Sequence, residues 1–153
     1  MDSHDDREDF AVKEPERPGV TSVTASWELS LILSAGWAVP LQARFHYCAA
    51  DPYAVRLDFY LDTARPVRWI FARDLLTAGL ARPTGRGDVR VWPVPDRALV
   101  SLRLVSEHGD ALFTADAAPL TAWLERTCQL VPPGQEFRFF DLDMLLDRLL
   151  SEP

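Results

Sequence analysis

The sequence contains one lysine, no asparagine and two isoleucines among its 153 residues. Because the codons of these three amino acids are rich in A and T, their scarcity indicates a GC-rich genome. Cysteine is scarce too, since Cys48 and Cys128 form neither a disulfide framework nor a zinc-binding spacing. No apolar run approaches the roughly 20 residues that span a membrane. The opening MDSHDDREDF lacks the basic start and apolar stretch of a signal peptide, which favours a cytoplasmic protein.

The negative charge of the chain is unevenly distributed. The net charge is −7, and residues 1–22 contribute −4 of it through seven carboxylates and three cations. Residues 23–153 hold the other 16 carboxylates and 13 cations, a net charge of −3. Because a net-negative body repels phosphate at long range, we expect no bulk electrostatic binding of nucleic acid. Residues 1–22 also lack hydrophobic periodicity, so we predict a disordered acidic N-terminal tail there.

From Val23 onward the pattern is typical of β-strands. Apolar and polar residues alternate through seven short segments separated by turn signals. These segments are residues 23–33, 37–47, 53–61, 66–72, 87–93, 97–107 and 110–116. Strands this short, mostly without helices between them, indicate an antiparallel sheet. Pro40, inside the second segment, indicates a sheet edge or a bulge.

Helical spacing is concentrated near the C-terminus. RDLLTAGL, at residues 73–80, predicts one short helix, and residues 119–131 and 141–150 predict two longer ones. Pro119 suits a first helical turn, and Asp141 is a candidate N-cap. We expect both longer helices to pack their leucine faces on the sheet or on a neighbouring subunit. The predicted fold class is α+β, a mostly antiparallel twisted sheet of about seven strands with two C-terminal helices.

The stretch WIFARDLLTAGLARPTGRGDVRVWP raises the question of a phosphate site, because it contains three glycines and four arginines. Gly79 and Gly85 are separated by five residues where a P-loop needs four, and no Lys-Ser/Thr pair follows. Gly85-x-Gly87 leads into a predicted strand, so no helix N-terminus faces a ligand. We therefore interpret the stretch as a strand, a short helix and a tight connection to the next strand.

No other group of residues predicts catalysis. His46 and Cys48 project from the same side of a predicted strand, but no carboxylate is spaced to orient the imidazole. Asp143 and Asp147 share a helical face, together with neither a histidine nor an oxygen-rich loop that would complete a metal site. We therefore predict that the protein is not an enzyme and that it uses no metal and no cofactor.

One face of the predicted sheet combines arginines with aromatic residues. The positions opposite the apolar face include Arg44, Arg56, Tyr60, Arg68, Arg90, Trp92 and Arg103. This composition is typical of protein–protein hot spots and equally of sheets that hold single-stranded nucleic acid. Carboxylates at Glu28, Asp58 and Asp88 leave a merely solvated face as a third interpretation. The candidate interaction face consists of Arg56, Tyr60, Arg68, Arg90 and Trp92.

Five motifs between Val23 and Leu150 resemble the SsgA-like family of actinomycete sporulation and cell division proteins. They are ADPYAV, WIFARDLL, GLARPTGRGDVRVWP, VPPG and FDLD, in that order. The resemblance implies that residues 23–153 form one SsgA-like domain with a whirly-like fold, assembled as a homotrimer. It also implies a non-enzymatic adaptor at the septum that recruits or positions division proteins such as FtsZ. The alternative is a single-stranded nucleic-acid-binding module that uses the arginine–aromatic face.

Overall fold

The computed structural model describes residues 21–61, 65–140 and 142–151, and in these residues seven strands form one antiparallel sheet. The strand order is β4-β3-β2-β1-β7-β6-β5. The strands are β1 (Ser22–Ser34), β2 (Trp37–Cys48), β3 (Ala54–Tyr60), β4 (Val67–Ala72), β5 (Val89–Val94), β6 (Leu99–Ser106) and β7 (Gly109–Asp116). The helices are α1 (Arg73–Gly79), α2 (Ala117–Leu130), the 3₁₀ turn η2 (Glu136–Arg138) and α3 (Leu142–Ser151). The predicted tail lies outside the described residues up to position 20, as does the candidate cap Asp141.

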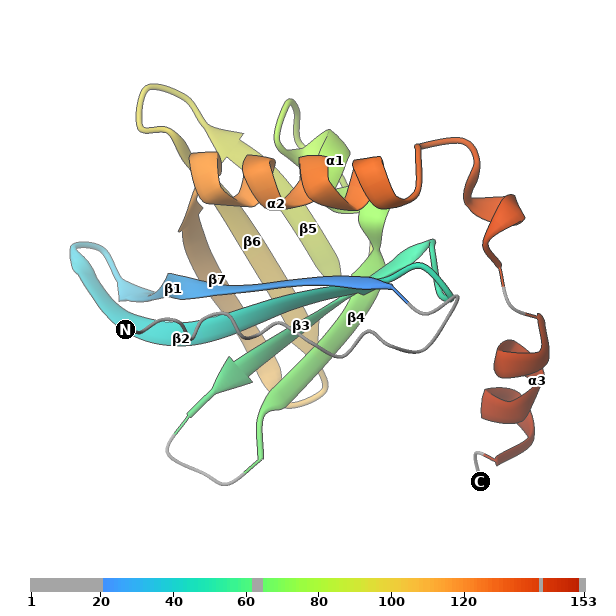
Figure 1. The fold of residues 1–153 in the computed structure, drawn as a ribbon. Helices are drawn as coiled ribbons and strands as arrows, with labels where there is room; N and C mark the ends of the chain where they lie inside the picture. The colour runs from blue at the N-terminus through green and yellow to red at the C-terminus, as the bar shows by residue number, and fades with distance from the viewer. Residues whose placement is uncertain (1–20, 62–64, 141, 152–153) are drawn as a thin grey trace, which may run out of the picture.

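The period-two pattern places one apolar face of every strand in a common core. The sheet curls, and α2 lies across one side of it (Figure 1). Phe59 of β3 stacks on Phe113 of β7 across this curl, with ring centroids 4.4 Å apart. Trp123 of α2 packs 5.4 Å from the Phe45 ring and donates its indole N–H to the Val23 carbonyl oxygen at 3.2 Å. The predicted α+β architecture of seven antiparallel strands is therefore confirmed.

The glycines between Trp69 and Pro93 shape the connection from β4 to β5. A Cβ atom at Gly79, the last residue of α1, would overlap the Val91 side chain of β5. Gly85 has a φ of +109°, a conformation that glycine adopts without strain. Between them Thr84 exchanges two backbone hydrogen bonds with Val91, of 2.8 and 2.9 Å, and so covers part of the outer edge of β5. The predicted strand, helix and connection are confirmed.

Two further predictions have different outcomes. Pro40 lies in β2 before the segment Gln42–His46 that pairs with β3, so among the described residues no strand pairs with that side of β2 at Pro40. The predicted local edge is confirmed. Helix α2 packs its apolar face on the sheet, whereas Leu142, Leu146 and Leu149 of α3 are exposed. Packing on the sheet is thus confirmed for α2 only, and for α3 the other expectation, contact with a neighbouring subunit, stays a prediction.

Candidate functional site

The predicted interaction face divides into two groups at opposite edges of the sheet. Residues paired across neighbouring strands project from the same face of the sheet. The face away from the core includes, for example, the paired series Ser30, Thr114, Ser101 and Trp92. All five predicted residues project from this side. Because β4 and β5 are the two outer strands, however, the β3–β4 residues are separated from those of β5 by four strands. Sequence spacing could not reveal this separation, since it depends on the strand order.

The first group, which we term the arginine cluster, surrounds one buried carboxylate. It consists of Arg44, Arg56, Asp58, Tyr60 and Arg68 on β2, β3 and β4. Asp58 is 1% exposed. It accepts hydrogen bonds of 2.9 and 3.2 Å from Arg68 Nε and Nη2, and Arg56 Nε lies 3.4 Å from its Oδ2 atom. The Arg44 guanidinium lies 5.2 Å from the centroid of the Tyr60 ring.

The electrostatics of the arginine cluster favour an ionised Asp58. Burial alone raises the pKa of this carboxyl, but the Arg68 hydrogen bond and the neighbouring guanidinium charges outweigh it and lower the pKa below its usual 3.8. Three cations around one carboxylate leave an excess of two positive charges. The cluster can therefore bind an additional anion without protonation of Asp58.

His46 lies on β2 beside this cluster, opposite Arg56. Burial, followed by the Arg56 charge, lowers the pKa of the imidazole below 6.5, which favours its neutral form. Its Nδ1 atom is 2.7 Å from the Thr24 hydroxyl oxygen. The imidazole thus has a structural hydrogen-bond partner on β1, and no hydrogen bond in the described structure joins it to Cys48. The geometry gives no support to a thiolate–imidazole pair.

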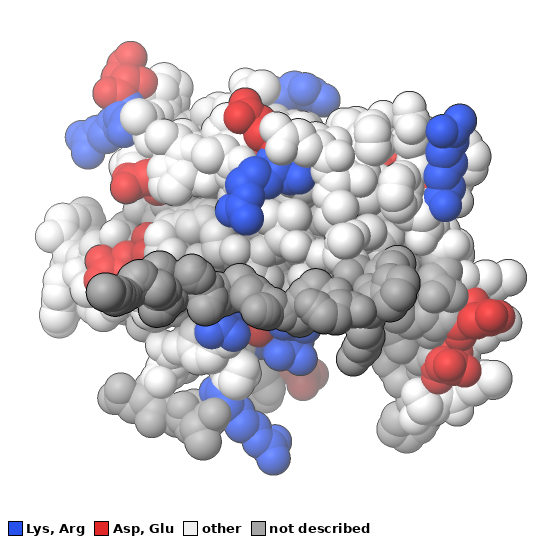
Figure 2. Space-filling view, viewed as in Figure 1, with Lys and Arg blue, Asp and Glu red and all other residues white. Residues whose placement is uncertain are grey.

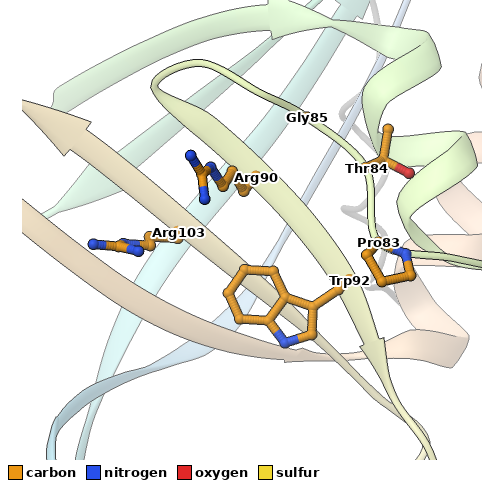
Figure 3. Close-up of a pocket in the computed structure, with 6 residues that line it drawn as sticks. All are labelled: Pro83, Thr84, Gly85, Arg90, Trp92 and Arg103. Carbon is orange, nitrogen blue, oxygen red and sulfur yellow. The ribbon is translucent and has the colours of Figure 1, made fainter.

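The second group, the Trp92 hollow, is a surface depression of about 270 Å³ on the β5–β6 side. It is lined by Pro83, Thr84, Gly85, Arg90, Trp92 and Arg103. Figure 3 shows the Trp92 indole between Pro83 and Arg103, with Arg90 beside them. Arg103 donates a 3.0 Å hydrogen bond from Nε to Asp110, and Arg90 lies directly opposite Arg103 in the register. An aromatic surface beside paired cations suits a ligand that carries both an anionic and an apolar group.

The direction of Trp92 agrees with the sequence prediction. Its neighbour Val91 is fully buried in the core and pairs with Leu102, whereas Trp92 pairs with Ser101 on the other side. Ser101 is nevertheless 5% exposed on that surface. A bulky indole opposite a small hydroxyl explains this burial. The alternating pattern thus determined the orientation of the side chain, and its role as a contact residue stays a prediction.

Sequence reasoning missed the buried Arg73 at the start of α1. Its Nη1 atom donates to the carbonyl oxygens of Thr127 and Val131 at 3.1 and 2.9 Å, which caps the C-terminal end of α2. Its Nη2 atom lies 2.9 Å from Glu136 Oε2. The guanidinium also lies 4.8 Å from the Tyr47 ring. The burial of Arg73 could not be predicted from residue spacing, because its hydrogen-bond partners are 54 to 63 residues away in the sequence.

On the face drawn in Figure 2, charged residues are dispersed and do not form one continuous stripe. Figure 2 shows basic and acidic residues there as separate patches on a largely uncharged surface. Among the described residues, no group of three or more histidines, cysteines, aspartates or glutamates could hold a metal ion. Of the helices in the described part of the chain, none has the length and apolar character needed to cross a membrane.

Comparison with known proteins relates this structure to a family. Residues 41–136 match the family described as Streptomyces sporulation and cell division protein, SsgA. The sporulation-specific cell division protein SsgB of Thermobifida fusca (strain YX) is 47% identical over 133 residues, which are 86% of this chain and 96% of that relative. SsgB of Streptomyces coelicolor is 46% identical over 134 residues, covering 86% of this chain and 98% of that protein.

Solved structures agree with these relatives. The crystal structure of an SsgA-like sporulation-specific cell division protein from Thermobifida fusca YX-ER1 is similar to this chain with a TM-score of 0.75 and 45% identity, over 85% of this chain and 96% of the other. A second solved structure carries the description "Mutations in SsgB correlate to longitudinal cell division during sporulation of Streptomyces coelicolor". Its TM-score is 0.76 at 44% identity, over 80% of this chain and 98% of that one.

Proposed function

The chain belongs to the SsgA family of sporulation and cell division proteins, and from this premise we propose that it is a non-enzymatic adaptor in septum-site selection and septum formation. It acts in the cytoplasm at the septum by recruiting or positioning a division protein, FtsZ or another septation protein. The names of its relatives support the process. The arginine and aromatic residues of the Trp92 hollow support protein contact as the means.

The observation that carries this proposal is the Trp92 hollow. Tryptophan and arginine are the residues most enriched in hot spots, and here they line a depression that a partner side chain can fill. Arg90 and Arg103 are like charges in opposite register positions, and Asp110 pairs with Arg103, so a further anion beside Arg90 would offset the remaining repulsion. We propose that an acidic residue beside an apolar one in the partner occupies this hollow.

The proposal is tested by Trp92→Ala in the full chain, with binding to purified FtsZ measured by sedimentation or biolayer interferometry. Loss of the indole should weaken binding by about 2 kcal/mol or more, roughly 30-fold. The matched control is Trp37→Ala, because Trp37 is 64% exposed at the β1–β2 turn, outside the hollow. Equal binding by wild type and Trp92→Ala would contradict the site. No binding by wild type would exclude FtsZ as the direct partner.

A second candidate function is binding of single-stranded nucleic acid. The same hollow supports it, since an indole can stack on a base while arginines pair with phosphate. The net charge of −7 opposes it. Labelled oligonucleotides measured across a salt series separate the two functions. A steep loss of affinity with salt would favour nucleic acid, and no binding at low salt would leave the adaptor.

We also propose that the chain assembles as a homotrimer with a whirly-like arrangement of sheet and helices. The exposed leucines of α3 support assembly, because they form an apolar face that the chain's own sheet does not cover. The specific number of subunits comes from the family resemblance.

A further inference from the structure

We propose that the acidic N-terminal segment, residues 1–20, docks on the arginine cluster of its own chain. The docked segment neutralises Arg44, Arg56 and Arg68 and shields them from other anions. This inference is independent of the proposed function, because it concerns the other edge of the sheet from the Trp92 hollow and needs no partner protein.

The point where the chain enters the sheet supports this docking. β1 begins at Ser22, and its Thr24 lies opposite His46 of β2, which in turn lies opposite Arg56 of β3. The Thr24–His46 hydrogen bond of 2.7 Å lies on the same side of the sheet as Arg56. Strands are spaced by about 4.8 Å, so Arg56 is roughly 10 Å across the sheet from Thr24.

The reach of the segment is sufficient. Glu16 and Glu14 precede Ser22 by six and eight residues, which allows an extended span of about 20–26 Å. Arg68, on the outer strand β4, is three strand spacings from β1, or about 14 Å. The carboxylates nearest the domain can therefore reach every arginine of the cluster, and those farther towards Met1 can do so with slack.

Charge supplies the attraction. The segment holds seven carboxylates and three cations. The cluster holds three guanidinium groups around Asp58, whose carboxylate already accepts both hydrogen bonds from Arg68. Glu28 of β1, opposite Gln42, is a further carboxylate on this side and opposes the docking without cancelling the positive excess. Arg56 Nε is buried beside Asp58 Oδ2 at 3.4 Å, an ion pair without hydrogen-bond geometry. A carboxylate from the segment supplies a charge-assisted acceptor for the partly exposed side chains of Arg56 and Arg68.

The Trp92 hollow is a less favourable place for the same segment. β7 pairs with the later part of β1, where Thr114 lies opposite Ser30. Arg103 of β6 lies opposite Leu112 of β7, two residues farther from the start of β1. Arg103 is therefore displaced along the strands from Ser22 by about ten residues, roughly 33 Å. Arg103 also has its own carboxylate partner, Asp110. The geometry therefore selects the arginine cluster.

Zero-length carbodiimide cross-linking of the full chain tests the docking. Arg68→Lys keeps the positive charge and supplies an amine, which the reagent joins to any carboxylate in direct contact. We expect peptides from residues 1–20 to be joined to position 68 at about 20 mM salt, and the yield to fall at least roughly fivefold at 0.5 M salt, because exposed charges are then screened. Arg44→Lys provides a second amine if Arg68→Lys fails to fold.

The matched control is Arg103→Lys, which places an amine on the same side of the sheet at the other edge. A link between Asp58 and position 68, or between Asp110 and position 103 in the control, shows that the introduced amine reacts in that variant. Equal tail yields at positions 68 and 103 would overturn the proposal, as would an Asp58 link without any tail link. Mixing unlabelled and ¹⁵N-labelled chains distinguishes the source of the segment. Cross-links mainly between differently labelled chains would show docking on a neighbouring copy and would overturn docking on its own chain.

Discussion

Arg73 shows how one residue can hold distant segments together. Its guanidinium meets the end of α2 at Thr127 and Val131, the carboxylate of Glu136 in η2, and the ring of Tyr47 in β2. Its side chain is 2% exposed and that of Glu136 is 9% exposed. Burial also raises the pKa of Tyr47 to about 12, and its hydroxyl donates to the Pro52 carbonyl at 2.8 Å. The groups around Arg73 are thus both buried and mutually satisfied.

Replacing Arg73 should therefore be strongly destabilising. Arg73→Met leaves Glu136 as an uncompensated buried charge and removes the donor to two helix-end carbonyls, so we expect a loss of about 3–5 kcal/mol in the free energy of unfolding. Urea denaturation followed by circular dichroism measures this change. Arg82→Ala, at an exposed position after α1, is the control and should stay within about 0.5 kcal/mol of wild type. A loss below 1 kcal/mol for Arg73→Met would contradict the assigned role.

The same pair predicts a pH dependence at the residue scale. Hydrogen bonds from its own backbone N–H, from Arg73 and from Gly134 lower the pKa of the Glu136 carboxyl below its usual 4.5. Because the folded-state pKa is the lower one, this stabilisation is complete above the unfolded value near 4.5 and is lost as pH falls through the folded value. Glu136→Gln should therefore be less stable at neutral pH and show a flatter stability profile below 4.5. Parallel profiles for the two proteins would argue against the linkage.

At the scale of elements, the contact between α1 and β5 depends on a missing side chain. A Cβ atom at Gly79 would overlap Val91, which is fully buried. Gly79→Ala should cost about 1–3 kcal/mol through overpacking, measured by thermal or urea unfolding. Gly87→Ala is the matched control, because a Cβ atom there has nothing within 4 Å. If both variants have the stability of wild type, α1 does not pack on β5 as closely as described.

The strands and helices could largely be predicted from the sequence. The contacts that bury charged side chains between them could not. Alternation located all seven strands and turned Trp92 away from the core, because residue polarity records which side is buried. Asp58 and Arg73 were not recognised as buried, since a charged residue is placed inside only by partners that other elements supply. For Asp58 these partners are neighbours in the sheet register, and for Arg73 they come from α2 and η2.

Helix α3 is the element whose leucines the sheet leaves uncovered. Leu142 and Leu149 are 57% and 62% exposed. If these side chains are covered by other subunits, Leu142→Gln with Leu149→Gln should lower the assembly from the expected trimer to a single chain in multi-angle light scattering. Asp143→Asn, at an exposed position of the same helix, should keep the wild-type mass. A single-chain mass for the wild type at micromolar concentration would rule out the trimer.

At the scale of the whole molecule, the order of the strands explains why the predicted interaction face became two sites. Arg56, Tyr60 and Arg68 share a side of the sheet with Arg90 and Trp92, as alternation predicted. The strand order then places the two sets at opposite outer edges. Alternation gives only the side of a sheet, whereas proximity depends on which strands pair. The chain therefore has two candidate contact surfaces that can be altered separately.

The long sequence separation of the Arg73 contacts also has a consequence for synthesis. Its partners lie 54 to 63 residues later in the chain, so the ribosome makes Arg73 well before the groups that neutralise it. The region around α1 can complete its packing only after Glu136 has been released from the exit tunnel. A message truncated before that codon would yield a chain with an unpaired cation where the fold requires burial, and quality-control proteases would degrade it. The packing around Arg73 is thus completed only after the residues through Glu136 have been made.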